Sequence, residues 1–242
     1  MKLALIGDPV AHSRSPELHN RFLREADLEG SYLAVRVPKG AAVEVVHRMR
    51  EDGYTGLNVT SPLKEEVLDV CAELDEEAAM AGAVNTIIFG RKIVGANTDG
   101  IGARTAMEAV IRNPVALERI GVLGTGATAR AILAQLREMD AYTFVWGRDA
   151  AKLGPVCERF EARPWPDNPP EFVISTLPPH VELPQRLVSD LQGADTIMDV
   201  NYGERSTLAA AVGREVVRGD LMFEAQARAS FNLWLSAHQL LK

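Results

Sequence analysis

A glycine-rich turn between a short apolar strand and a helix constrains the fold of this chain more than any other segment. We expect a strand over residues 120–123 and a helix over 128–139, joined by a turn with the pattern Gly-x-Gly-x-x-Ala. Gly124 permits the tight turn, Gly126 lets a phosphate approach the backbone, and Ala129 keeps the helix close to the strand. The N–H groups at the helix N-terminus favour a bound pyrophosphate. The segment therefore predicts a dinucleotide-binding α/β unit.

The residues after the next expected strand, 142–146, bear on which dinucleotide is bound. An acidic side chain at this point binds the ribose 2′-hydroxyl of NAD, whereas an arginine accepts the 2′-phosphate of NADP. Here the strand is followed by Gly147, Arg148 and Asp149. Arg148 favours NADP because a guanidinium group matches the geometry of a phosphate. Asp149 either caps the next helix or repels that phosphate.

Alternating strands and helices fill the first hundred residues and predict a further sheet. The apolar patterns indicate strands over 2–6, 32–37 and 56–59, a hairpin over 84–94 that turns at Gly90–Arg91, and helices over 15–30, 41–51 and 98–111. We expect Ser15 to be the N-cap of the first helix, with Pro16 in its first turn. We expect Ser61 to cap another helix in the same way, ahead of Pro62.

The second half of the chain repeats the strand–helix alternation, with strands also over 172–175 and 196–200 and a closing helix over 220–241. Repeated βα units imply parallel sheets with covered faces. We therefore predict an α/β fold of two domains. A substrate-binding and catalytic domain spans 1–100, a dinucleotide-binding domain spans 101–219, and the helix at 220–242 packs back on the first domain.

Composition excludes some classes of protein. A net charge of −7, from 33 acidic and 26 basic residues, gives no support for nucleic-acid binding. No apolar run approaches the ~20 residues that span a bilayer. Cys71 and Cys157 are far apart and form no CxxC motif, so neither a disulfide framework nor a metal cluster is expected. We expect a cytoplasmic protein with a small-molecule substrate and no metal. No segment marks an interface, so both a monomer and a homodimer are open.

Four polar segments follow expected strands of the first domain, at residues 12–16, 58–64, 83–86 and 97–100. In an open α/β sheet, ligands bind beyond the carboxyl ends of the strands, so the four segments could converge on one cleft. Their hydroxyl and amide side chains suit a polyhydroxylated ligand. The same segments contain one lysine, Lys64, and one aspartate, Asp99.

Lys64 and Asp99 are candidates for acid–base chemistry. With Ser61 as N-cap, Lys64 would fall in the first helical turn, where a cation opposes the helix dipole at a cost of ~0.3–1 kcal/mol. A residue that breaks a local rule is often functional, although a lysine that extends into solvent explains the position equally well. Asp99 would stand at the start of a helix, where the helix dipole stabilises a carboxylate whether or not it has a catalytic role. If the two meet at one cleft, the carboxylate would hold the ammonium in place.

Six segments in one order along the chain resemble the shikimate dehydrogenase family. They are residues 7–20, 58–64, 82–86, 95–100, the glycine turn at 124–129, and 219–226 with Phe231 and Trp234. The resemblance spans nearly the whole chain. It implies an amino-terminal substrate domain and a Rossmann-like NADP-binding domain with a cleft between them. It also implies the reversible reduction of 3-dehydroshikimate to shikimate with NADPH, in aromatic amino-acid biosynthesis.

The resemblance also implies roles for individual residues. Lys64 and Asp99 become the catalytic pair, in which Lys64 protonates the nascent alkoxide and Asp99 orients Lys64. The substrate residues are Ser13, Ser15, Asn58, Thr60, Asn85, Tyr202 and Gln226. The cofactor residues are Gly124, Thr125, Gly126, Ala127, Thr128, Arg148 and Met222. Ser13 and Ser15 would bind the substrate carboxylate, and helix capping is the alternative role for both.

This chain departs from the family pattern at several places: residues 175–180 stand where the family has an Asn-x-(Thr/Ser) stretch, and two further departures lie among the expected cofactor residues. Ala127 stands where the family usually has a further glycine, and Gly147-Arg148-Asp149 stands in place of Asn-Arg-Thr. A relative that acts on quinate or on an aminated analogue stays open. So does a non-catalytic ligand-binding relative, although its signature would be the loss of Lys64 or Asp99, and both are present. The His-Ser-x-Ser-Pro motif at 12–16 argues against a folate-linked dehydrogenase of similar architecture.

Overall fold

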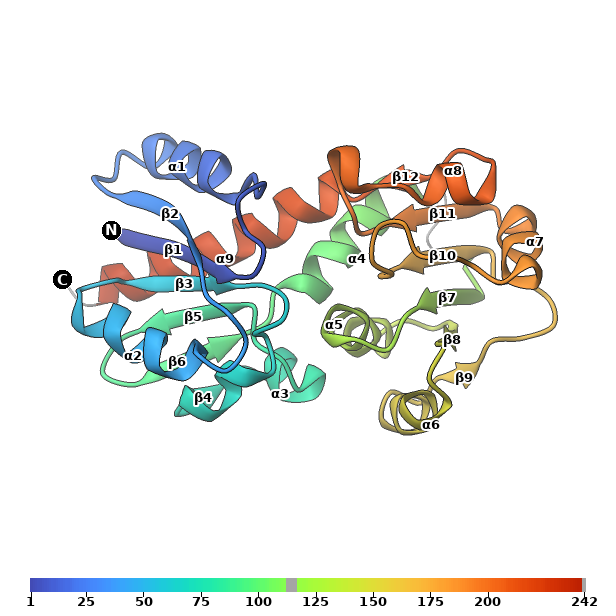
Figure 1. The fold of residues 1–242 in the computed structure, drawn as a ribbon, viewed down its shortest axis with the longest axis horizontal. Helices are drawn as coiled ribbons and strands as arrows, with labels where there is room; N and C mark the ends of the chain where they lie inside the picture. The colour runs from blue at the N-terminus through green and yellow to red at the C-terminus, as the bar shows by residue number, and fades with distance from the viewer. Residues whose placement is uncertain (112–116, 241–242) are drawn as a thin grey trace. The chain divides into compact units, whose positions relative to one another are not determined.

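The computed structural model describes residues 1–111 and 117–240, which form two compact units with one six-stranded sheet each (Figure 1). One unit comprises Met1–Asp99 and the chain from Gln226, and the other comprises Gly100–Ala225. The expected boundaries fall after residues 100 and 219, whereas the compact units divide after residues 99 and 225. The assignment of a substrate domain and a dinucleotide domain to these units stays a prediction. Residues 241–242, the end of the expected closing helix and domain, lie outside the described residues.

The sheet of the first unit is mixed, with parallel strands on one side and a hairpin on the other. Its strands, in spatial order, are β2 (Ser31–Arg36), β1 (Lys2–Gly7), β3 (Gly56–Val59), β5 (Thr86–Phe89), β6 (Ile93–Ala96) and β4 (Glu73–Leu74). β1 pairs in parallel with β2 and β3, while β5 is antiparallel to both β3 and β6. The predicted hairpin is confirmed.

Two different cores cover the faces of this sheet. Helix α2 (Ala42–Glu51), the 3₁₀ helix η1 (Glu66–Val70) and α3 (Glu76–Ala81) contribute to an aliphatic core with the inward residues of β1 and β3, such as Ile6 and Leu57. Helices α1 (Ser15–Glu25) and α9 (Asp220–Leu240) instead bring aromatic rings together. Trp234 of α9 donates a hydrogen bond to the carbonyl oxygen of Ile87. A Cβ at Gly56 would lie 2.2 Å from the Trp234 Nε1, so this close approach of helix and strand requires glycine there.

The sheet of the second unit pairs in parallel throughout its described strands. Its order is β12 (Val217–Arg218), β11 (Thr196–Asp199), β10 (Phe172–Ser175), β7 (Arg119–Leu123), β8 (Tyr142–Trp146) and β9 (Arg163–Pro164). Its helices are α4 (Asp99–Val110), α5 (Ala127–Leu136), α6 (Ala150–Arg159), α7 (Gln185–Gly193) and α8 (Leu208–Val212). The α/β class with two parallel-rich sheets is confirmed. Helices α3, α7 and α8 were not among the sequence-based expectations, and α6 was expected only as the helix that Asp149 could cap.

Two predicted helix caps are wrong. The N-cap of α1 is Arg14, so Ser15 is the first helical residue. No α-helix follows Ser61, because residues 61–65 form turns ahead of η1 and the Ser61–Pro62 peptide bond is cis. The backbone carbonyl of Lys64 accepts a hydrogen bond of 2.8 Å from the N–H of Val84. Lys64 therefore does not stand in the first turn of a helix, and the dipole argument made for it does not apply.

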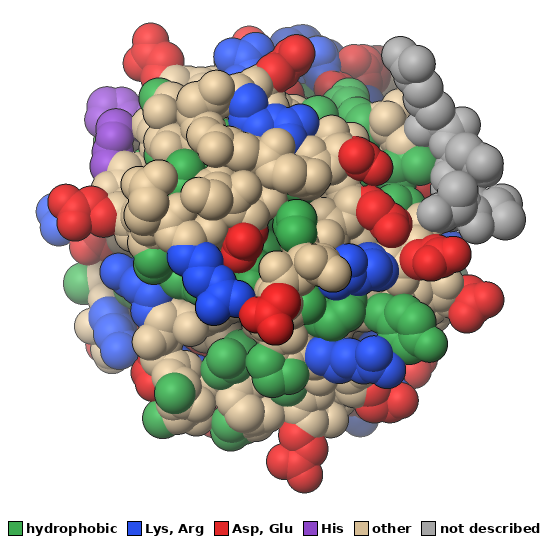
Figure 2. All heavy atoms as spheres, turned by 90° about the vertical axis from the view of Figure 1, so that its right-hand side faces the viewer, with side chains coloured by type: hydrophobic (Ala, Val, Ile, Leu, Met, Phe, Trp, Pro, Cys, Tyr) green, Lys and Arg blue, Asp and Glu red, His purple; other side chains and the backbone are tan. Residues whose placement is uncertain are grey.

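Basic and acidic side chains are interspersed over the face of the molecule shown in Figure 2. Ion pairs of the second unit include Arg186–Asp167 and Arg137–Glu161, whose side chains are largely exposed. Pairs of this kind contribute about 0–1 kcal/mol each, so they affect solubility more than stability. Among residues 1–111 and 117–240, no helix is both long enough and apolar enough to span a membrane.

Candidate functional site

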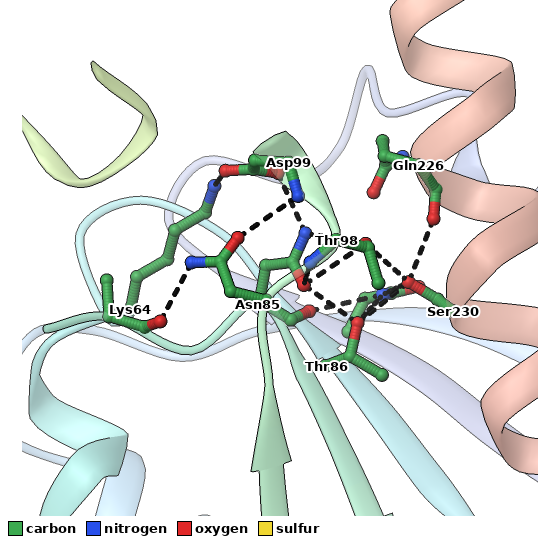
Figure 3. A network of polar contacts seen from close by, with 10 residues as sticks. Lys64, Asn85, Thr86, Thr98, Asp99, Gln226 and Ser230 are labelled. Atoms are coloured by element: carbon green, nitrogen blue, oxygen red, sulfur yellow. Dashed lines mark hydrogen bonds and ion pairs between the residues drawn. The ribbon is translucent and has the colours of Figure 1, made fainter. Parts of the chain in front are cut away.

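Lys64 and Asp99 form a largely buried ion pair in the first unit (Figure 3). Lys64 lies in the turns after β3, and Asp99 is the first residue of α4. The Lys64 Nζ lies 2.5 Å from the Asp99 Oδ2, and the side chains are 13% and 8% exposed. A charge pair with so little water around it interacts more strongly than one on the surface. The ammonium is therefore held at a fixed position while retaining some access to solvent.

Asn85 supports the carboxylate of this pair. Its Nδ2 donates to the Asp99 Oδ1 at 2.7 Å and to the Thr98 Oγ1 at 2.9 Å. Its Oδ1 accepts from the backbone N–H of Thr98 at 2.9 Å and from the Thr86 hydroxyl at 2.8 Å. Because a backbone N–H can only donate, this network fixes which end of the amide faces Asp99.

Asn58 lies beneath this cluster and is buried. Its Oδ1 accepts a hydrogen bond of 2.7 Å from the hydroxyl of Tyr32, and its Nδ2 donates to the backbone carbonyl of Asn85 at 3.1 Å. Both polar ends of the Asn58 side chain are thus bonded within the protein. The structure gives this residue contacts that hold the backbone of Asn85 in place.

Of the other predicted substrate residues of the first unit, Ser15 is buried, whereas Ser13, Thr60 and Gln226 are only partly buried. The Ser13 hydroxyl lies 3.1 Å from the Ser15 hydroxyl and accepts from the Ser15 backbone N–H at 3.2 Å. Thr60 follows β3, with its N–H bonded to the carbonyl of Ile6. Gln226 lies on α9, half-buried, one helical turn before Ser230 (Figure 3).

Sequence reasoning missed the hydroxyl residues that connect this cluster to α9. Ser230 is fully buried, and its hydroxyl lies 2.7 Å from the Thr86 Oγ1 and 3.0 Å from the Thr98 Oγ1. The available signal was a serine four residues after Gln226 on a helix whose neighbouring residues, Phe231 and Trp234, are large and apolar. A serine on such a face requires a hydrogen-bonding partner when it is buried.

In the second unit, the glycine turn has the geometry of a phosphate-binding site. Gly124 has a φ of +117°, a backbone conformation that favours glycine. A Cβ there would also lie 2.3 Å from the Thr176 Oγ1, so the space around this residue excludes a side chain. A Cβ at Gly126 would have no described atom within 4 Å, and no side chain caps α5 at this residue. The N-terminus of α5 therefore faces open space, which fits the pyrophosphate of a dinucleotide. Ala127 and Thr128 begin the helix.

The segment after β8 confirms the capping role of Asp149. Its side chain is the N-cap of α6 and accepts a hydrogen bond of 3.0 Å from the backbone N–H of Ala151. The neighbouring Arg148 is exposed. The carboxylate thus has a structural role at the start of α6, and the guanidinium is accessible to a ligand phosphate.

Tyr202 and Met222 also belong to the second unit. The ring of Tyr202 packs on that of Phe223 with centroids 4.3 Å apart, and Met222 is buried. The loop that contains Tyr202 is anchored by Asp199, which accepts hydrogen bonds from Asn201 and Ser206. Burial raises the pKa of the Asp199 carboxyl. In the parts of the chain that the structure describes, no three His, Cys, Asp or Glu residues could hold a metal ion together.

Residues 5–87 match the family model described as "Shikimate dehydrogenase substrate binding domain". A shikimate dehydrogenase (NADP(+)) from Bacillus licheniformis is 34% identical to this chain, over 95% of the chain and 90% of that protein. One from Methanococcus aeolicus is 39% identical over 59% of the chain and 51% of its own length. Both relatives are thus named as enzymes with the same activity.

Solved structures of shikimate dehydrogenases have the same fold. One from Aquifex aeolicus has a TM-score of 0.86 and 28% identity, covering 98% of this chain and 92% of its own. One from Thermus thermophilus, in complex with NADP(H) and shikimate, has a TM-score of 0.82 and 28% identity, covering 98% and 94%. The likeness therefore includes both sheets.

Proposed function

The chain belongs to the shikimate dehydrogenase family, and we propose that it reversibly reduces 3-dehydroshikimate to shikimate with NADPH, a step of aromatic amino-acid biosynthesis. The observation that carries this proposal is the buried contact between Lys64 Nζ and Asp99 Oδ2. A positioned ammonium is a general acid for a ketone that becomes an alcohol, and its neutral form is a general base for the reverse reaction. The non-catalytic alternative would have no use for such a pair.

In the proposed reaction, Lys64 donates or accepts the proton, and Asp99 holds the Lys64 side chain in position. NADPH, when bound, supplies the hydride that adds to the ketone carbon. Lys64 donates one proton to the ketone oxygen, which becomes the hydroxyl group of shikimate. Lys64 then regains a proton from solvent, to which its side chain is 13% exposed. In the oxidation of shikimate, Lys64 instead accepts the hydroxyl proton. Asp99 remains a carboxylate throughout, because its Oδ1 accepts from Asn85 and its Oδ2 from Lys64.

The polar residues around this pair are assigned to the substrate. Ser13 and Ser15 suit the ring carboxylate, since their hydroxyls lie together ahead of α1. The remaining assignments are Thr60, Asn85, Gln226 and Tyr202, with Asn58 acting through the backbone of Asn85. In the second unit, the glycine turn and Met222 are assigned to the dinucleotide and Arg148 to its 2′-phosphate. The first unit is thus the substrate domain and the second the NADP domain.

We further propose that the enzyme acts in the cytoplasm, as a monomer or homodimer, with no nucleic-acid partner. Cys71 and Cys157 are both free thiols, which fits a reducing compartment. Size-exclusion chromatography with light scattering separates a monomer of 26.4 kDa from a dimer.

The test is an absorbance assay of reduced nicotinamide formation, with shikimate or quinate as substrate and NADP or NAD as cofactor. We expect the pair shikimate and NADP to give the highest kcat/KM. A higher value with quinate would move the assignment to a quinate dehydrogenase. No turnover with either substrate would reject the enzyme assignment.

A further inference from the structure

Ser230 connects helix α9 to the buried side chains that support the catalytic pair. It lies in the middle of α9, whereas Thr86 and Thr98 lie on the loops and strands of the sheet. All three hydroxyl residues are buried, and the Ser230 Oγ contacts both threonine hydroxyls (Figure 3). The mechanism described above does not use Ser230. Its contacts with residues that support the catalytic pair raise the question of what it contributes to that pair.

The hydrogen bonds of Ser230 can be given directions. The Thr86 hydroxyl donates to the Asn85 Oδ1 at 2.8 Å, so the 2.7 Å bond between the Thr86 and Ser230 hydroxyls takes its proton from Ser230. A hydroxyl has two lone pairs. One lone pair of the Ser230 Oγ accepts from the Nδ2 of Asn58 at 3.1 Å, and the other accepts from the Thr98 hydroxyl at 3.0 Å.

A directed chain of hydrogen bonds therefore runs from Asn85 to α9. The Asn85 Nδ2 donates to the Thr98 Oγ1, the Thr98 hydroxyl donates to the Ser230 Oγ, and the Ser230 hydroxyl donates to the Thr86 Oγ1. The other proton on the Asn85 Nδ2 is donated to the Asp99 Oδ1, at 2.7 Å. Ser230 thus keeps the Thr98 hydroxyl turned so that it can accept from Asn85.

We propose that Ser230 is a positioning residue for the catalytic pair, because it orders the Thr98 hydroxyl and thereby the amide that holds Asp99. This inference rests on the proposed function and extends the machinery of that function to the C-terminal helix. Ser230 contacts neither Lys64 nor Asp99 in the interactions described, and it acts through Thr98 and Asn85.

The loss of the Ser230 hydroxyl has a defined chemical consequence. The Thr98 N–H still fixes which end of the Asn85 amide faces Asp99, but the Thr98 hydroxyl then turns toward the Asn85 Oδ1, at 3.3 Å, and the Asn85 side chain is held less firmly. Asp99 is left without the Asn85 donor for part of the time, so its carboxylate attracts the Lys64 ammonium more strongly. Lys64 must be neutral to accept the proton of shikimate, so oxidation then requires a higher pH.

Four variants separate the hydroxyl from packing. Ser230→Ala and Ser230→Val lack the hydroxyl group, and Ser230→Thr keeps it. Val and Thr have nearly the same shape, so the difference between them reports the hydroxyl alone. Ser236→Ala is the matched control, because Ser236 is exposed on the same helix. For each variant, kcat and KM for shikimate oxidation with NADP are measured across pH, at a temperature at which circular dichroism shows it folded.

We expect Ser230→Ala and Ser230→Val to lower kcat by about tenfold, the scale of one buried hydrogen-bond partner lost, with KM for shikimate within about twofold of wild type. The pH of half-maximal turnover should rise in both variants. Ser230→Thr and Ser236→Ala should keep the wild-type kcat and pH profile.

Equal kcat values for the Val and Thr variants would overturn the proposal, because packing would then explain any loss. An unchanged kcat and pH profile in the Ala variant would overturn it as well. If the Ala variant fails to fold, the comparison of kcat between the Val and Thr variants tests the proposal. A wild-type enzyme without shikimate oxidation would reject the proposed function itself, which is a different outcome from a Ser230 variant with normal activity.

Discussion

The methyl group of Thr125 lies 2.8 Å from the position that a Cβ atom would take at Gly147. The glycine turn after β7 and the end of β8 are therefore packed so closely that a side chain at residue 147 would displace Thr125. The sequence analysis found Gly147 where the family pattern has asparagine. The structure supplies a physical reason for that departure, because Thr125 fills the space that the asparagine side chain would need.

Gly147→Asn should weaken NADPH binding, because the new side chain pushes Thr125 and with it the turn that faces the pyrophosphate. Overpacking of this kind costs about 1–3 kcal/mol. The double variant with Thr125→Ser should recover part of the loss, since serine lacks the clashing methyl group. Isothermal titration with NADPH measures both. Additive effects of the two substitutions would contradict the proposed steric coupling.

Arg148→Ala should raise the Kd for NADPH and leave that for NADH nearly unchanged, because the guanidinium is assigned to the 2′-phosphate alone. A charge-assisted hydrogen bond of this type contributes about 1.5–3 kcal/mol, or roughly tenfold to a hundredfold in Kd. Arg186→Ala is a control, as Arg186 is an exposed arginine of the same unit that pairs with Asp167. Equal losses for both cofactors would show that the phosphate assignment is wrong.

Lys64→Ala should lower kcat by at least ~10²-fold, the usual scale for a general acid or base, with a smaller effect on KM. Asp99→Asn should also lower kcat, because a neutral amide attracts the ammonium much less than the carboxylate does. Stopped-flow and steady-state measurements of shikimate oxidation provide the numbers, and Lys39→Ala, at an exposed lysine, is the control. Wild-type turnover in Lys64→Ala would remove Lys64 from the mechanism.

Much of the fold was predictable because apolar periodicity and turn residues agree with each other over most strands. The glycine turn and the hairpin at 84–94 lie where their patterns indicated. The segment at 61–65 was not predictable from its own residues, because serine followed by proline suits a turn as well as a helix start. A hydrogen bond from Val84, 20 residues away, to the Lys64 carbonyl favours the turn.

The candidate site likewise has a part that could be predicted from the sequence and a part that could not. Lys64 and Asp99 follow β3 and β6, so their approach could be inferred from where ligands bind in such sheets. Asn85 instead precedes β5, and it lies at the same edge because β5 is antiparallel to both strands. Ser230 could not be placed, because its contact with Thr98 depends on how α9 packs against the sheet, and no local pattern specifies that. The aromatic residues around Ser230 signalled burial but not its partners.

A buried histidine makes the stability of the first unit sensitive to acid. The ring of His19 is stacked on that of Tyr32, with centroids 4.3 Å apart and planes 6° apart, and it is 0% exposed. Neither of its nitrogens has a hydrogen-bond partner among the described residues. Burial, and to a lesser degree the nearby Arg228 guanidinium, lowers the pKa of His19 from 6.5 to about 3, and the Asn58 side chain, close by but outside normal hydrogen-bond geometry, opposes this shift.

The sign of the effect follows from proton counting. Below pH 6.5 the unfolded chain binds a proton at His19, whereas the folded protein does so only near pH 3. The contribution of His19 to stability is therefore fully present above pH 6.5 and is lost as the pH falls toward about 3. Within that window, this one group changes the free energy of unfolding by up to roughly 1.4 kcal/mol per pH unit.

His19→Phe should remove this dependence, because phenylalanine keeps a stacking ring and has no titrating group. Urea denaturation at several pH values between about 4 and 6 should give a slope of unfolding free energy against pH that is smaller than the wild-type slope by up to roughly 1.4 kcal/mol per unit. Overpacking by the larger ring would lower stability equally at every pH, so the slope and not the absolute value is the readout. His47→Phe, at an exposed histidine of α2, should leave the slope unchanged. A wild-type slope in His19→Phe would mean that the imidazole is protonated in the folded protein, and the aromatic cluster around it would then need a charge partner that Arg228 cannot be.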